Sequence, residues 1–283
     1  MPASDLLRTF RNDILKWNRS RPGRPTGGRG RENFTRSLRA EPLETRAMLA
    51  AYVVDTPLDN PLEGTDDVDG FVSLREAITA VNTNLPFGDA PAGDGGGIVD
   101  QITFDESLIG QSVILAGVEL AITDGLSIIG MGEANVTISG DNVSRIFSID
   151  AGVRVDISDV TIADGSAFNG GGIYNNGVLT ITNATLAGNT SEKQGGGIWS
   201  DGSLDITNST FSDNSSYDDG GGIWNGGALD IAQSLFLNNS ATRHGGGIHN
   251  VDGTVTIADS TFTGNSAPGS GATGGAFSSF IHL

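Results

Sequence analysis

Apolar and polar residues alternate in short runs along most of this chain, and from Gly170 onward the pattern repeats about every 25 residues. In the run Leu204-Asp205-Ile206-Thr207, every second residue is apolar, which is typical of a β-strand with one buried face. A glycine run followed by Ile recurs in each repeat, at residues 170–173, 195–198, 220–223 and 245–248. A period of this length is typical of stacked supersecondary units, so the pattern predicts a solenoid.

A second set of positions recurs between the glycine runs. An apolar residue is followed three positions later by Asn in four successive repeats: Leu186 and Asn189, Phe211 and Asn214, Phe236 and Asn239, Phe262 and Asn265. We expect an internal apolar column and a ladder of Asn side chains at a turn, where Asn tolerates left-handed backbone. The chain therefore predicts an all-β parallel β-helix of about seven coils. A leucine-rich-repeat horseshoe is disfavoured, because its Leu spacing is missing and Gly and Thr are poor helix formers.

The segment 74–83 has a helical pattern instead. Ser73 and Glu76 have the spacing of a capping box, and the apolar residues that follow share one helical face. We expect a short amphipathic helix that covers the first coil, because an open end exposes core and unpaired strand edges. The run Val72-Ser-Leu-Arg-Glu-Ala77 resembles the CSLREA element that precedes β-helical repeats in many bacterial surface proteins, with Val72 in place of the cysteine.

Charge divides the chain into a basic arm and an acidic body. Residues 1–50 contain eleven Lys/Arg and five Asp/Glu, whereas residues 51–283 contain five and twenty-nine, which gives the net charge of −18. The acidic body argues against a nucleic-acid partner, whose phosphates require basic residues. No apolar run reaches the length of a transmembrane helix. The Arg-, Gly- and Pro-rich segment 1–35 is expected to be a disordered leader.

Residues 36–52 follow this leader and read as a targeting segment. Glu41-Pro42-Leu43-Glu44-Thr45-Arg46 and Met48-Leu49-Ala50 resemble the short N-terminal motif of many large secreted planctomycete proteins, with Thr45 in place of its proline. The resemblance implies export or surface attachment. We therefore divide the chain into the leader (1–35), this targeting segment (36–52), an N-terminal cap with the helix (53–100), and the β-helix (101–283).

The repeats over residues 155–277 resemble those of chlamydial polymorphic outer membrane proteins. The matching pieces are the Gly-Gly-aliphatic runs and Phe211-Ser-Asp-Asn214, Phe236-Leu-Asn-Asn239 and Phe262-Thr-Gly-Asn265. The resemblance implies a right-handed β-helix that is secreted, at the cell surface or associated with the outer membrane, and adhesin-like. It also implies a polysaccharide or a cell-surface or matrix protein as partner. The chain ends soon after its last glycine run, so we expect a product truncated at the C-terminus.

One column of the repeat is aromatic. Tyr174, Trp199, Trp224 and His249 each follow the Ile that ends a glycine run. Neighbouring residues of a strand point to opposite faces, so these rings are expected on the outside. Four rings at coil spacing form a platform for sugar faces or for a partner's side chains. The alternatives are that a loop covers them or that they stack only on each other.

A charged corner precedes the glycine runs. Lys193, Asp218 and Arg243 occupy one column, for which a salt-bridge ladder is the simpler interpretation, and Gln194, Asp219 and His244 occupy the next. Asp218-Asp219 with His244-Gly245 weakly resembles pieces of polygalacturonases, which are also right-handed β-helices with the pectin lyase-like fold. Glycoside hydrolysis needs two carboxylates, one as acid and one as base. The resemblance implies a carbohydrate-active hydrolase or lyase with Asp218, Asp219 and His244 as its catalytic candidates.

Calcium is the one cofactor that the sequence suggests. Residues 65–76 have the spacing of an EF-hand loop, with Asp67, Asp69 and Glu76 as ligand candidates, although Thr65 stands where the first ligand should be Asp. Glu76 is equally explained by the capping box. The sequence thus favours a structural or adhesive surface module over an enzyme. The binding module predicts an exposed row of rings at residues 174–249, whereas the enzyme predicts a cleft at residues 218–244 with both carboxylates facing it.

Overall fold

The computed structural model describes residues 50–60, 69–93, 99–269 and 274–280. All described residues belong to one compact unit, Arg46–Leu283. The predicted leader (1–35) and nearly all of the predicted targeting segment (36–52) therefore lie outside the described residues. The expectations for these two segments stay predictions.

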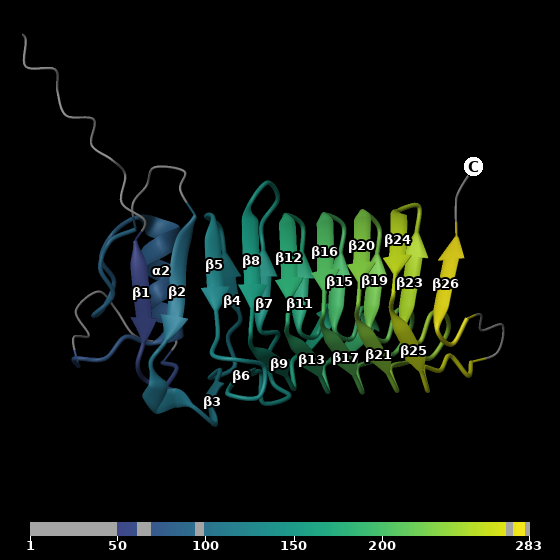
Figure 1. Ribbon diagram of the computed structural model, residues 1–283, viewed down its shortest axis with the longest axis horizontal. Helices are drawn as coiled ribbons and strands as arrows, with labels where there is room; N and C mark the ends of the chain where they lie inside the picture. The colour runs from purple at the N-terminus through teal and green to yellow at the C-terminus, as the bar shows by residue number, and fades with distance from the viewer. Residues whose placement is uncertain (1–49, 61–68, 94–98, 270–273, 281–283) are drawn as a thin grey trace, which may run out of the picture. The chain divides into compact units, whose positions relative to one another are not determined.

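This unit is a stack of coils whose strands form four parallel sheets, numbered here in the order in which a coil visits them (Figure 1). Sheet 1 consists of β1 (Ala51–Val54), β2 (Asp100–Phe104), β5 (Leu126–Ile129), β8 (Arg154–Ser158), β12 (Val178–Thr182), β16 (Ser203–Thr207), β20 (Ala228–Ala232) and β24 (Thr254–Ala258). Sheet 2 consists of β3 (Gln111–Ile114), β6 (Val136–Ser139), β9 (Thr161–Ala163), β13 (Thr185–Ala187), β17 (Thr210–Ser212), β21 (Leu235–Leu237) and β25 (Thr261–Thr263).

The other two sheets complete each coil. Sheet 3 consists of β10 (Ser166–Asn169), β14 (Thr190–Gln194), β18 (Ser215–Ser216) and β22 (Ser240–Ala241). Sheet 4 consists of β4 (Leu120–Ile122), β7 (Phe147–Ile149), β11 (Ile173–Asn175), β15 (Ile198–Ser200), β19 (Ile223–Asn225), β23 (Ile248–Val251) and β26 (Phe277–Phe280). Among the described residues, the helix α2 (Leu74–Thr83) and the 3₁₀-helix η1 (Glu106–Leu108) precede the regular coils.

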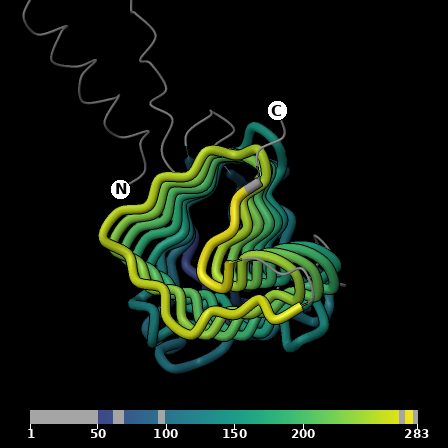
Figure 2. The backbone as a smooth tube through the Cα atoms, turned by 90° about the vertical axis from the view of Figure 1, so that its right-hand side faces the viewer, coloured from purple at the N-terminus to yellow at the C-terminus, as the bar shows by residue number. Residues whose placement is uncertain are grey.

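The predicted right-handed parallel β-helix is confirmed. Figure 2 views the coils from their C-terminal end, and the chain runs counterclockwise as it advances toward the viewer, which makes the solenoid right-handed. Ile173 pairs with Ile198, and Ile198 with Ile223, at the predicted 25-residue offset. The offset grows by one residue in the next coil, where Ala228 pairs with Thr254.

The interior consists of columns of identical or similar apolar residues. The inward Ile of sheet 4 is fully buried in each regular coil, at Ile173, Ile198, Ile223 and Ile248. The Phe211 and Phe236 rings of sheet 2 stack with their centroids 4.7 Å apart, and neither is exposed. Parallel strands lie about 4.8 Å apart, so equal side chains in one column pack face to face.

The Asn ladder is confirmed, but its backbone conformation differs from the prediction. The Asn189 side chain donates to the Asn214 Oδ1 atom over 2.9 Å, and Asn214 donates to Asn239 over the same distance. The left-handed residue is the one before each ladder Asn, namely Gly188, Asp213, Asn238 and Gly264. The side chain of each ladder Asn thus forms buried hydrogen bonds, and the residue before it adopts the left-handed backbone of the turn.

The glycine runs make the corner between sheets 3 and 4. Gly195 has a φ of +67°, where a Cβ atom causes strain. A Cβ atom on Gly196 would lie 2.4 Å from the carbonyl oxygens of Ser215 and Gly221. The corner therefore requires glycine at both positions, for backbone conformation at the first and for close approach of the next coil at the second.

The helix α2 is capped and anchored as the sequence predicts, at the N-terminal end of the stack (Figure 1). The Ser73 hydroxyl accepts from the Glu76 amide, and the Glu76 carboxylate accepts from the Ser73 amide over 2.8 Å. Leu74, Ala77 and Val81 are buried against the first coils. Within the described ranges, no helix is long and apolar enough to cross a membrane.

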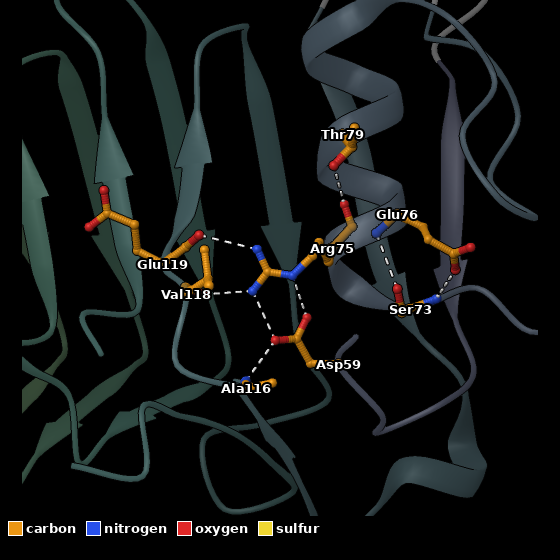
Figure 3. Close-up of polar contacts among 8 residues, drawn as sticks. All are labelled: Asp59, Ser73, Arg75, Glu76, Thr79, Ala116, Val118 and Glu119. Carbon is orange, nitrogen blue, oxygen red and sulfur yellow. Dashed lines mark hydrogen bonds and ion pairs between the residues drawn. The ribbon is translucent and has the colours of Figure 1, made fainter. Parts of the chain in front are cut away.

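Arg75 ties this helix to the first coil of the solenoid (Figure 3). Its guanidinium binds both carboxylate oxygens of Asp59, over 2.6 and 2.8 Å, and donates to the carbonyls of Val118 and Glu119 over 2.6 and 3.2 Å. Asp59 also accepts from the Ala116 amide over 2.9 Å. The planar Arg75 guanidinium thus binds one carboxylate and two carbonyl groups at once, and this holds α2 against the loop before β4.

The solenoid begins inside the segment that we assigned to targeting. Ala51 and Tyr52 lie in β1, which pairs with β2, and the Tyr52 side chain is 1% exposed. Val54 is fully buried as well, whereas Val53 is exposed. The alternation in this strand shows that these residues belong to the core of the first coil.

Candidate functional site

Two columns of side chains lie next to each other at the corner between sheets 3 and 4. The ring column consists of Tyr174, Trp199, Trp224 and His249, which are paired in register in sheet 4. The polar column consists of Asn169, Gln194, Asp219 and His244, which are paired in the same way along sheet 3. The columns meet across the glycine run, because the rings of His244 and His249 have their centroids 5.3 Å apart. We call this region the corner.

The aromatic residues stack on one another. The Tyr174 and Trp199 rings have their centroids 4.3 Å apart and are parallel to within 5°, and Trp199 and Trp224 are 5.1 Å apart and parallel to within 1°. All three side chains are half-buried. Both faces of the Trp199 ring and one face of the Trp224 ring are therefore covered, and a ligand can reach only the exposed part of each half-buried side chain. Ligand binding by this column stays a prediction.

Arg145 closes the N-terminal end of the ring column. Its guanidinium carbon lies 5.0 Å from the centroid of the Tyr174 ring, a cation–π arrangement. The same guanidinium forms an ion pair with Glu119 and donates to the carbonyls of Gly170 and Asn169 over 3.0 and 2.9 Å. Sequence reasoning missed this residue, and the one available signal was a lone Arg in the uncharged stretch 142–149.

His249 lies at the opposite end of the column. It is 3% exposed, and its Nδ1 atom lies 3.0 Å from the Ser278 hydroxyl of the next coil. Burial lowers the pKa of His249 to about 4, the nearby Asp219 carboxylate partly opposes this, and His244 and Arg243 lower it further. His249 is therefore neutral near pH 7, so it can act as a hydrogen-bonding group or as a metal ligand.

The two neighbouring carboxylates have different partners. The Asp219 Oδ1 atom lies 2.7 Å from His244 Nδ1, and the Asp219 residue is 6% exposed. The Asp218 carboxylate lies 3.9 Å from Arg243, whose side chain is 56% exposed. Nothing in these contacts brings Asp218 and Asp219 to one reacting bond, so the hydrolase hypothesis gains no support from the geometry.

The predicted salt-bridge ladder is represented by one pair. Arg243 and Asp218 form it, whereas the Lys193 ammonium lies 5.7 Å from the centroid of the Phe168 ring. An exposed pair at this distance contributes little to stability.

The corner brings together three residues that sequence reasoning assigned to two different sites. One ligand atom from each of Asp219, His244 and His249 lies within 4.8 Å of the others. Asp219 and His244 were candidates for hydrolysis, and His249 was a candidate for ring stacking. The 25-residue offset between Asp219 and His244, and the five-residue step across the glycine run to His249, were the signals that the sequence offered.

The predicted calcium loop is only partly described. Asp67 lies outside the described residues. Both Glu76 oxygens accept backbone hydrogen bonds, from Ser73 over 2.8 Å and from Asp89 over 3.2 Å, and the side chain is buried. The Asp69 carboxylate accepts from the Phe71 amide over 2.9 Å. The structure thus gives Glu76 a capping role, and calcium binding at this loop stays a prediction.

The regular coils are similar to a known repeat family. Residues 208–226 and 233–251 match the Chlamydia polymorphic membrane protein repeat. Each matched segment ends in a glycine run and the strand of sheet 4 that follows it, and together they contain Asp219, Trp224, His244 and His249. No curated protein and no solved structure matches the chain.

Proposed function

We propose that this protein is a surface-associated β-helical module, secreted or held at the cell surface or outer membrane, that binds a polysaccharide or a protein along the corner. The similarity of residues 208–226 and 233–251 to the Chlamydia polymorphic membrane protein repeat supports the surface association. The parallel solenoid supports it too, because repeat proteins present extended binding surfaces. Since fold does not fix function, the corner itself has to support the choice of binding face.

The observation that carries this proposal is the ring column beside the polar column. The indole nitrogens of Trp199 and Trp224 and the Oδ1 atom of Asn169 are buried and have no hydrogen-bond partner among the residues that the structure describes. Buried polar groups in folded proteins are almost always paired, so these atoms, which have almost no accessible surface, call for an acceptor or donor that reaches them through a local opening of the corner. Hydroxyl groups of a sugar polymer can act as both.

The spacing of the corner favours a polymeric ligand. Equivalent residues of successive coils lie about 4.8 Å apart, so the corner repeats a ring edge and a polar group in every coil. A polymer can contact several coils at once, and linked contacts strengthen binding without any single strong one. Stacking of a sugar on the Trp199 ring is disfavoured, because both of its faces are occupied by Tyr174 and Trp224.

A pull-down with a panel of neutral and acidic polysaccharides tests the proposal. We expect the wild-type chain to be retained and the double variant Trp199→Ala/Trp224→Ala to lose at least about tenfold in affinity, as anchors of a binding surface do. Trp199→Tyr/Trp224→Tyr should keep most of the binding, because Tyr174 occupies the same column. Tyr217→Ala is the matched control, since this aromatic residue is 72% exposed and lies outside the column.

Two results would contradict the proposal. One is retention that is unchanged in Trp199→Ala/Trp224→Ala but lost in Tyr217→Ala. The other is release of oligosaccharides from the same panel that disappears in Asp219→Asn, because the corner would then be a hydrolytic site. Circular dichroism of each variant must show wild-type β content for the comparison to count.

A further inference from the structure

The cluster of Asp219, His244 and His249 has the composition and placement of a metal site. Asp219 and His244 are joined by an isolated parallel bridge between successive coils, just after the strands β18 and β22 of sheet 3, and His249 lies in β23 of sheet 4. Asp219 and His249 are buried, and His244 is half-buried. The chain contains three histidines, and two of them lie in this cluster. Within the described ranges, it is the one group of three metal-ligating side chains that lie this close together.

The solenoid explains why these three side chains meet. Stacking places residue 244 over residue 219, one coil apart, and the glycine run 245–247 turns the chain so that residue 249 faces residue 244. The preceding coils have the same geometry with Asn169 and Tyr174, or with Gln194 and Trp199, and these side chains offer no comparable ligand set. The backbone geometry of the cluster therefore repeats in the preceding coils, and only the side chains at these positions differ.

Two imidazoles and one carboxylate select a class of ion. Imidazole nitrogen suits Zn²⁺ and its neighbours among the divalent transition metals, whereas Ca²⁺ and Mg²⁺ take oxygen ligands. Ligand atoms lie about 2.0–2.1 Å from Zn²⁺, so two ligands of a tetrahedral ion are about 3.3 Å apart. The atoms here lie within 4.8 Å of one another, so binding requires the side chains to close by up to roughly 1.5 Å.

We propose that Asp219, His244 and His249 bind one divalent transition-metal ion of the zinc class. Coordination through the Nε2 atom of His249 keeps its Nδ1 contact to Ser278, which lies 3.0 Å away and fixes the ring, as outer partners of metal-bound histidines do. His244 and Asp219, now 2.7 Å apart, exchange their mutual hydrogen bond for bonds to the ion. Three protein ligands leave a fourth position for water or an external group.

The surroundings of the cluster agree with this proposal. His249 is 3% exposed and Asp219 is 6% exposed, so an ion held between them is largely shielded from solvent. Arg243 is the cation that acts on the cluster, and its NH1 atom lies 3.9 Å from the Asp218 carboxylate. The Asp219 carboxylate supplies the negative charge that a divalent ion requires.

Zn²⁺ titration of the EDTA-treated full chain by isothermal calorimetry tests the proposal, with Co²⁺ absorption spectra as a second readout. We expect one ion per chain and visible Co²⁺ bands from nitrogen and oxygen ligands. Asp219→Gln, His244→Gln and His249→Trp should each weaken binding at least about tenfold. These substitutions introduce residues that the same columns already hold, Gln194 and Trp199, so the fold should tolerate them.

The controls separate this site from other sources of binding. Asp218→Asn changes the neighbouring carboxylate, and His282→Gln removes the third histidine of the chain. Both variants should bind Zn²⁺ as the wild type does. Failure of the wild type to bind, or binding that survives His249→Trp and is lost in His282→Gln, would overturn the proposal. The measurement needs no polysaccharide, so its outcome is independent of the proposed function.

Discussion

The indole rings of Trp199 and Trp224 lie with their centroids 5.1 Å apart and are parallel to within 1°. They belong to neighbouring coils, and their Cα atoms are paired in register. The stacking therefore follows from the 25-residue period itself. It turns a row of outward aromatic residues into one continuous column.

This stacking should contribute to stability. Trp224→Ala removes the ring next to Trp199 and opens the half-buried column, so we expect a loss of about 2 kcal/mol in the free energy of unfolding. Urea denaturation followed by circular dichroism measures it. Tyr217→Ala is the control and should change stability by less than about 0.5 kcal/mol, because that side chain is 72% exposed. Equal effects of the two substitutions would show that the column does not stabilise the fold.

The buried Asn ladder should be more sensitive than the column. The Asn214 side chain donates to Leu186 O and Asn239 Oδ1, each over 2.9 Å, and accepts from the backbone and side chain of Asn189. Asn214→Ala leaves these buried partners unpaired, so we expect a loss of about 3–5 kcal/mol, measured by the same denaturation.

A variant at an exposed Asn–Asn hydrogen bond serves as the control for the buried ladder. Asn208 donates to Asn183 over 2.8 Å at an exposed turn where its φ is +50°. Asn208→Gly keeps that backbone conformation and should destabilise by about 1 kcal/mol or less. A loss for Asn214→Ala no greater than that for Asn208→Gly would contradict the role given to the ladder.

The Arg75 fork should control the N-terminal cap locally. Arg75→Ala leaves the buried Asp59 carboxylate without its cation, so we expect about 3 kcal/mol of local destabilisation, and Arg75→Lys should recover only part of it. Hydrogen exchange measures this, with faster exchange at the amides of α2 and unchanged exchange at those of β20. Arg154→Lys is the control, since the Arg154 side chain is 57% exposed. Uniform acceleration across all coils would argue against a local anchor.

The periodic part of the fold could be predicted from the sequence. The inward Ile and Phe columns, the Asn ladder and the helix at 74–83 all follow from spacing and local capping, and the structure confirms them. The conformation of the ladder was only partly foreseen, because a preference of Asn for left-handed backbone does not say whether the ladder Asn or its predecessor makes the turn. In the structure the predecessor does, as at Asp213 before Asn214.

The contacts that break the period could not be predicted. Arg75 and Asp59 both precede the regular coils, and Arg145 lies just before β7, which pairs with the strand of Tyr174. Neither Arg recurs in the repeat, so the period does not encode these contacts. The ring column was expected on the outside, but how far each face is covered depends on the packing of successive coils. The cluster at Asp219, His244 and His249 depends on the direction of the corner at the glycine run, which spacing alone does not give.

The corner as a ligand-binding face is the central claim of this account. Hydroxyl-radical footprinting of the full chain, with and without the polysaccharide that retains it, tests the claim most directly. We predict that bound polymer protects Trp199 and Trp224 from oxidation and leaves the exposed Tyr217 unprotected. Protection at Tyr217 with none at the two indoles, or no retention by any polymer or protein tested, would contradict it.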